Sequence, residues 1–219
     1  MRTNVSRGCQ RSIAHNMSSP DSGAGGRTSR EEGKVSRHLG LFHSHVYTYR
    51  TPWEKVAQAL WQRYPNPYSN HVLSEDTLSR QSRGRRLLSR RLLRKTNSAP
   101  KWLERFVGGK GASACIVEES EVDMATKTFT TYTRNVNFNK LMTVEEKAIY
   151  TVSPENKEWT SCKKEAWVCC KVRGISLAVE KFGVERYRKN ADTAQLGLEF
   201  VIDKIFAIRS QILAAPVRK

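Results

Sequence analysis

No segment of this sequence is apolar over the roughly 18 residues that a membrane-spanning helix requires, and its start has no apolar core typical of a secretory signal. The five cysteines include no C-x-x-C spacing, which argues against a zinc site and against a complete disulfide framework. The nucleophile elbow, the H-E-x-x-H pair and the Walker loop are all missing. We therefore predict neither an integral membrane protein nor an enzyme, and we expect no cofactor.

Acidic side chains are scarce. The 219 residues include 21 Asp and Glu against 38 Lys and Arg, which gives a formal net charge of +17. Such an excess favours an anionic partner, which could be nucleic acid, anionic lipid or an acidic protein. The hydrophobic content of 38% is low for a globular chain, so we expect one domain with an unpacked segment beside it.

The unpacked segment is predicted at the start of the chain. Residues 1–38 are rich in Ser, Gly, Arg and Asn and show neither helical nor strand periodicity, which is typical of a disordered basic extension. We expect the folded domain over residues 39–210 and a short basic tail over residues 211–219.

A rigid corner is predicted after the first helix. The start Thr51-Pro-Trp-Glu54 indicates an N-cap at Thr51 with Glu54 closing a capping box, and apolar residues at spacings of three and four continue to about Tyr64. Pro65 and Pro67 then stop the helix and force extended geometry on the residues before them. The corner should hold four polar or aromatic side chains in place, namely Arg63, Tyr64, Tyr68 and His71.

Strand patterns dominate the middle of the chain. One strand is expected before the helix at 43–50, and turn residues separate further strands at 71–80, 85–95, 113–123, 127–137, 141–152 and 159–172. Short turns between successive strands predict an antiparallel meander. The leucine pairs of the segment 85–95 also fit a short helix. A long helix follows from Ile175 to Ile205, with a kink or break near Gly183.

Anion binding is the best supported chemistry. Seven cations and no acid occupy residues 83–95, and in a strand Lys95 shares a face with Arg91 and Leu93. A cation that faces an apolar cavity is costly unless an anion meets it, and a phosphate with acyl tails satisfies both environments. The nearby acids at 118–123 alternate between two faces of their strand, which disfavours a catalytic carboxylate pair.

RNA binding is the alternative from a different class. The loop Gly108-Gly-Lys-Gly111 matches the G-x-x-G loop of KH domains. A strand-like run follows it where a helix is required, and the basic run 83–95 contains no aromatic residue for base stacking.

Six motifs then support a resemblance over residues 41–206. In order they are Arg63-Tyr-Pro-Asn-Pro-Tyr-Ser-Asn-His-Val-Leu73, Leu92-Leu-Arg-Lys95, Pro100-Lys-Trp102, Thr131-Tyr-Thr-Arg-Asn135, Val144-Glu-Glu146 and Phe200-Val-Ile202. They resemble the PRELI-domain family. The resemblance implies an α+β, START-like and PITP-like fold, in which a curved seven-stranded antiparallel sheet, a long C-terminal helix and a short lid helix enclose a lipid cavity.

The resemblance also implies a function. Family members carry phosphatidic acid from the outer to the inner mitochondrial membrane to supply cardiolipin synthesis. They work in the intermembrane space, bind membranes peripherally and pair with a small helical-hairpin chaperone that has twin C-x9-C motifs. A phospholipid-binding adaptor without net transfer is the alternative within this class, and no nucleic-acid partner is expected.

Family positions that contact phosphate fall on five residues of this sequence, namely Arg63, His71, Lys95, Arg186 and Asn190. Two positions that are basic in some relatives are Ser98 and Thr193 here, so the preferred lipid could differ. The family's mobile lid corresponds to about residues 97–111 and includes Pro100, Trp102, Phe106, Gly108 and Gly109.

Overall fold

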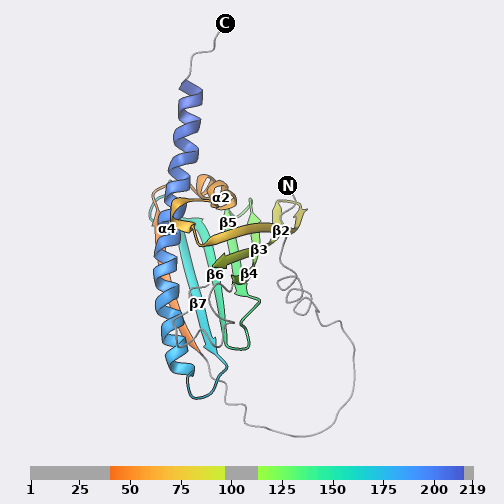
Figure 1. The fold of residues 1–219 in the computed structure, drawn as a ribbon. Coiled ribbons are helices and arrows are strands. Elements are labelled where there is room, and N and C mark those ends of the chain that lie inside the picture. The colour runs from red at the N-terminus through yellow and green to blue at the C-terminus, as the bar shows by residue number, and fades with distance from the viewer. Residues whose placement is uncertain (1–39, 97–112, 215–219) are drawn as a thin grey trace, which may run out of the picture.

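The computed structural model describes residues 40–96 and 113–214, with side chains up to residue 207. Seven antiparallel strands form one sheet in the order β1-β7-β6-β5-β4-β3-β2 (Figure 1). The strands are β1 (Leu41–Tyr49), β2 (Val72–Arg83), β3 (Arg86–Thr96), β4 (Ser113–Asp123), β5 (Thr128–Asn135), β6 (Met142–Val152) and β7 (Thr160–Cys170). The helices are α2 (Trp53–Trp61), the 3-10 turn η1 (Pro67–Ser69) and α4 (Ser176–Ala214).

The predicted meander is confirmed. Each expected strand is present within about three residues of its predicted ends, and the ambiguous segment with leucine pairs is the strand β3. Leu92 and Leu93 point to opposite faces of the sheet, and both are almost completely buried, at 2% and 1% exposed. The paired leucines therefore reflect a strand that is covered on both faces and not one face of a helix.

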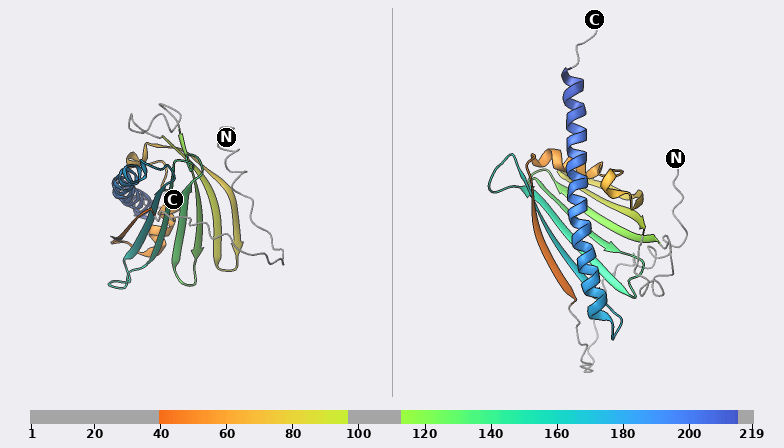
Figure 2. Two further views of the ribbon diagram at one scale, coloured as in Figure 1. Left: turned by 90° about the horizontal axis from the view of Figure 1, so that it is seen from below. Right: turned by 60° about the vertical axis from the view of Figure 1, so that its left-hand side comes forward.

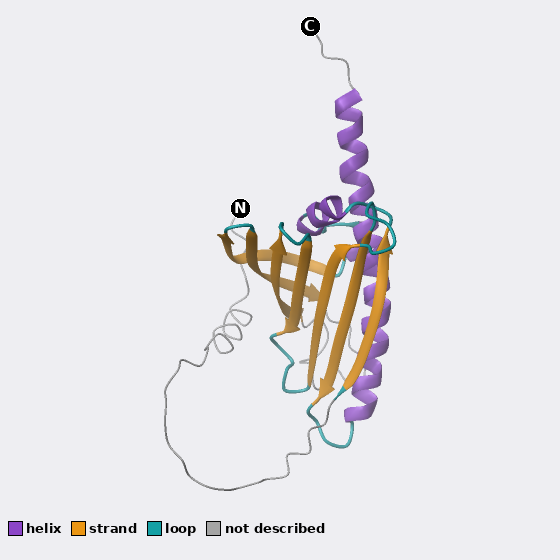
Figure 3. Cartoon of the chain, turned by 180° about the vertical axis from the view of Figure 1, so that it is seen from behind, coloured by secondary structure: helices purple, strands orange, loops and turns teal. Residues whose placement is uncertain are grey.

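The first strand of the chain lies beside the last one. β1 pairs with β7 at one edge of the sheet, whereas β2 forms the opposite edge. The chain crosses from one edge to the other through α2 and η1, which lie at one end of the curved sheet (Figure 1). The long helix α4 lies along one face of the sheet, and its C-terminal part extends beyond the strands (Figures 2 and 3).

The main core lies where α2 meets α4 and the sheet. Trp53 is 1% exposed, and its indole N–H donates a hydrogen bond to the carbonyl oxygen of Tyr150 at 3.1 Å. The predicted capping box is wrong, because α2 begins at Trp53 and no side chain caps its first turn. The helix also ends at Trp61, three residues before Tyr64. Residues buried in this core include Val56, Leu60, Phe129, Leu198, Val201 and Ile202.

The helix α4 continues through Gly183, so the predicted interruption is wrong. A Cβ atom at Gly183 would lie 2.7 Å from Cγ1 of Val168 and 2.9 Å from Sδ of Met142. This glycine therefore lets the helix approach the sheet closely. Within the described ranges, no helix is both long and apolar enough to cross a membrane.

Candidate functional site: a cavity between the sheet and α4

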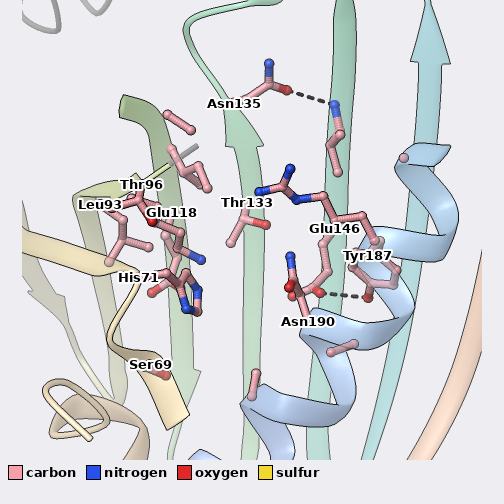
Figure 4. Close-up of a pocket in the computed structure, with 18 of the residues that line it drawn as sticks. Ser69, His71, Leu93, Thr96, Glu118, Thr133, Asn135, Glu146, Tyr187 and Asn190 are labelled. Carbon is pink, nitrogen blue, oxygen red and sulfur yellow. Dashed lines mark hydrogen bonds between the residues drawn. The ribbon is translucent and has the colours of Figure 1, made fainter. Parts of the chain in front are cut away.

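A cavity of about 450 Å³ lies between the sheet and the first half of α4 (Figure 4). This volume is within the range of about 300–1,000 Å³ typical of small-molecule sites. Much of the wall is apolar and comes from β3, β4, β6, α4 and the loop before β6. Its apolar residues include Leu93, Ile116, Phe138, Leu141, Met142, Val144 and Phe182.

All five residues that the sequence proposed as phosphate ligands line this one cavity. Arg63 follows α2, His71 immediately precedes β2, and Lys95 lies near the end of β3. Arg186 and Asn190 are one turn apart on α4, and the Asn190 side chain points into the cavity (Figure 4). Three segments that are distant in the sequence thus contribute polar groups to the same space.

The corner between α2 and β2 is held by its own hydrogen bonds. The buried side chain of Asn66 accepts a hydrogen bond from the backbone N–H of Tyr68 at 2.9 Å and donates one to the carbonyl oxygen of Arg63 at 2.5 Å. The helix α4 passes close by, since a Cβ atom at Gly197 would lie 2.8 Å from Oδ1 of Asn66. Tyr68 itself is 42% exposed and packs against Phe200 outside the cavity.

Several cations of the cavity lie close enough to affect one another. Burial lowers the pKa of His71, and the positive charges of Lys95 and Arg186 lower it further. Burial also lowers the pKa of Arg186. The backbone N–H of Thr96 donates to the carbonyl oxygen of His71 at 2.8 Å, which fixes the start of β2 beside the end of β3. This part of the cavity is therefore a positively charged region that favours an anion.

Two carboxylates also line the cavity, and the sequence analysis assigned neither of them to the site. Glu118 on β4 is 1% exposed and accepts hydrogen bonds from Arg63 and from Arg91. Burial alone would raise the pKa of Glu118, but the two guanidinium groups outweigh it, and the net shift is downward. Burial alone would lower the pKa of Arg63, but Glu118 outweighs that effect and raises it.

Glu146 on β6 lies at the other side of the cavity. The hydroxyl of Tyr187 donates a hydrogen bond to Oε2 of Glu146 at 2.7 Å (Figure 4). Burial and the adjacent Glu146 carboxylate both raise the pKa of Tyr187. This bond joins α4 to β6 beside the position of Asn190.

A further cation, Lys164 on β7, also lines the cavity and was not predicted. It is 6% exposed, and its ammonium group lies 5.2 Å from the ring centroid of Tyr47. With His71 neutral, four positive and two negative side chains line the cavity among the described residues, a net charge of +2. The alternation of β7 could have indicated that Lys164 shares a face with Cys162 and Ala166.

The other predicted positions do not join this group. Thr193 is not among the cavity residues, and its hydroxyl donates to the carbonyl oxygen of Lys189 at 2.8 Å. Ser98 and the whole predicted lid, together with the G-x-x-G loop, lie outside the described residues. In the part of the chain that the structure describes, no three His, Cys, Asp or Glu side chains are placed to hold a metal ion. Because its lining combines cationic and apolar side chains, the cavity can hold an anionic group beside apolar groups.

The fold has remote structural relatives. TTHA0849 from Thermus thermophilus has a TM-score of 0.51 at 14% identity and covers 74% of this chain and 97% of its own. The Zhui aromatase/cyclase from a Streptomyces species also has a TM-score of 0.51, at 11% identity, with 75% and 94% covered. At such low identity the likeness concerns the fold alone, and it confirms the predicted START-like sheet and helix.

Sequence relatives are much closer. PRELI domain-containing protein 1, mitochondrial, of Gallus gallus is 45% identical over 169 residues, 76% of this chain and 79% of that protein. The Homo sapiens protein of the same name is 44% identical, with 71% and 72% covered. Protein UPS1, mitochondrial, of Saccharomyces cerevisiae is 33% identical, with 78% and 97% covered. Residues 54–208 match the model of the PRELI-like family. This chain therefore belongs to the PRELI-like family.

Proposed function

We propose that this protein carries phosphatidic acid from the outer to the inner mitochondrial membrane and so supplies cardiolipin synthesis. The observation that carries the proposal is the gathering of His71, Lys95 and Arg186 in one partly apolar cavity. A phosphate could sit among these groups while the start of the acyl chains lies along the apolar wall.

The charge of the cavity supports a phosphate monoester. With His71 neutral, the lining side chains that the structure describes sum to +2, and a phosphate monoester carries about −1.5 to −2 at pH 7. A phosphodiester such as phosphatidylcholine carries a single negative charge on its phosphate and a positive charge on its choline. Phosphatidic acid therefore matches the cavity better than a zwitterionic lipid does.

The cellular setting of the proposal follows from the family. The three sequence relatives named above are mitochondrial by name, and we place this protein in the intermembrane space, bound peripherally to membranes. The net charge of +17 supports docking on anionic membrane surfaces. We further propose a heterodimer with a small twin C-x9-C helical-hairpin chaperone, as the resemblance implies.

A vesicle assay tests the proposed function. Donor vesicles carry labelled phosphatidic acid or labelled phosphatidylcholine, and transfer to acceptor vesicles is measured with the full chain. The proposal fails if phosphatidic acid moves no faster than phosphatidylcholine. Extraction from donors without delivery to acceptors would instead support a lipid-binding adaptor.

A pair of variants assigns the lipid to the cavity. Lys95→Gln should reduce transfer of phosphatidic acid by about tenfold or more, because a hydrogen bond to a charged group is lost. Arg90→Gln removes the same charge from a residue that pairs with Glu119 outside the cavity, so it serves as the matched control. Equal effects of the two substitutions would show that only surface charge matters.

A further inference from the structure

Four side chains of alternating charge form a continuous network from the edge of the sheet to the cavity. They are Glu75 on β2, Arg91 on β3, Glu118 on β4 and Arg63 in the corner. The two inner members are almost inaccessible, at 2% exposed for Arg91 and 1% for Glu118. Arg63 and Glu118 line the cavity, whereas Arg91 and Glu75 are not among its lining residues.

The contacts use both oxygens of the Glu118 carboxylate. Oε1 accepts from Nε of Arg91 at 3.0 Å and also from its Nη2, and Oε2 accepts from Nη2 of Arg63. Nη1 of Arg91 donates to Oε1 of Glu75 at 2.6 Å. Two guanidinium groups thus meet two carboxylates, and the network as a whole is neutral. Nε of Arg63 is buried and has no hydrogen-bond partner among the residues that the structure describes.

This arrangement offsets the charge of Arg63 before any cargo enters. The cation faces the cavity, but a fully desolvated carboxylate already holds one end of its guanidinium group. Buried ion pairs contribute little net stability compared with apolar residues of similar size, so stability alone is a weak reason for such a network. A lipid phosphate would therefore meet Arg63 at a reduced effective charge.

We propose that Glu118 is a positioning residue that acts as an internal counter-anion and limits how tightly the cavity holds a lipid phosphate. The inference rests on the proposed function. A transfer protein must release its cargo as well as extract it, and differences in affinity between related complexes lie mostly in the dissociation rate. By offsetting Arg63, Glu118 keeps that rate high, while its hydrogen bond holds the guanidinium group beside the cavity.

The substitution Glu118→Gln separates this role from a purely structural one. The amide keeps the size of the side chain but removes the charge, so that Arg63 and Arg91 no longer share a carboxylate. The apo variant should be less stable, because the positive charges are left uncompensated. Phosphatidic acid should bind more tightly, by about tenfold or more, since a unit charge a few ångströms away acts at an effective dielectric constant of about 20.

The assay measures binding and release separately. Full-length protein is incubated with vesicles of phosphatidic acid and phosphatidylcholine to obtain an affinity, and loaded protein is then mixed with acceptor vesicles to obtain a release rate. Glu118→Gln should show higher affinity and slower release. Glu119→Gln removes the same charge from the adjacent residue, which faces away from the cavity and pairs with Arg90, and it should remain within about twofold of the wild type, as surface changes usually do.

The outcomes distinguish the two proposals. A wild type that does not prefer phosphatidic acid over phosphatidylcholine refutes the proposed function. A wild type that does prefer it, with Glu118→Gln binding equally or more weakly, overturns only the role of Glu118. If Glu118→Gln does not fold, the double variant Arg91→Met with Glu118→Gln keeps the network neutral and should also bind more tightly. Failure of both variants to fold would overturn the inference, because the carboxylate would then serve the fold alone.

Discussion

Changing Tyr187 to Phe removes one hydroxyl group from the cavity wall and leaves the aromatic ring in place. That hydroxyl donates to Oε2 of Glu146 at 2.7 Å and joins α4 to β6. Both partners are partly buried, so the carboxylate would lose a donor that water replaces poorly. A hydrogen bond to a charged group contributes about 1.5–3 kcal/mol. We therefore expect Tyr187→Phe to lower the free energy of unfolding by about 2 kcal/mol.

Tyr47→Phe is the matched control for this substitution. Its hydroxyl donates to Oδ1 of Asp192 at 2.9 Å and likewise joins α4 to the sheet, in this case to β1. The acceptor differs, because Asp192 is exposed and water can replace the lost donor. Tyr47 itself is buried, but the substitution removes only its hydroxyl, so the expected loss is below about 1 kcal/mol, within the range of an ordinary hydrogen bond.

Urea unfolding followed by circular dichroism gives both free energies. For a chain of this size, about 1 kcal/mol corresponds to a shift in Tm of about 2–4 °C, so thermal unfolding gives an independent measurement. Tyr187→Phe should lower Tm by about 4–8 °C by the same relation. Equal losses for the two variants, or a larger loss for Tyr47→Phe, would refute the reasoning that burial of the acceptor decides the cost.

Two further outcomes follow from the burial of single side chains. Trp53→Ala should lower the free energy of unfolding by about 3–5 kcal/mol, because it empties a fully buried site. Trp167→Ala, at a site that is 38% exposed, should lower it much less. Similar losses in urea unfolding of the two variants would contradict this reasoning. The pKa of His71 in the folded protein lies below its ordinary value of 6.5. As the pH falls below 6.5, the unfolded chain therefore binds a proton at His71 more readily than the folded protein does. This difference favours unfolding, so the apo protein should lose stability in that range. His71→Gln should remove that share of the loss, and an unchanged pH profile of unfolding would contradict the assignment.

The strands could be predicted because their signal is local. Alternation and turn residues lie within each segment, so β4 and β6 were located to within a residue of their ends. The prediction of a capping box was wrong because this end of the helix depends on a distant contact. Thr51 matches the pattern, but its carbonyl oxygen accepts a hydrogen bond from the hydroxyl of Thr160, and α2 begins without a side-chain cap. At Gly183 the sequence shows only a weak helix former, whereas the close approach to Val168 depends on how α4 packs.

The sequence indicated most of the cations of the cavity but not its acids. Arg63, His71 and Lys95 were indicated by motifs, and the structure brings them to one cavity. Glu118 was set aside because alternation places it opposite Glu119, and alternation cannot tell which face is covered. Its partners Arg63 and Arg91 are 55 and 27 residues away in the sequence. Only the assembled sheet reveals that a carboxylate separates these two cations.

The order of the strands explains why the corner and the cavity belong together. Because β1 and β2 form opposite edges, the chain between them must cross one end of the sheet, and the corner is the last part of that crossing. Arg63 and His71 therefore reach the inward faces of β4 and β3, where Glu118 and Lys95 lie. The helix that carries Arg186 packs on the same corner, since Gly197 leaves no room for a Cβ atom beside Asn66. A change in the spacing of the cations that line the cavity thus requires the corner and α4 to move together.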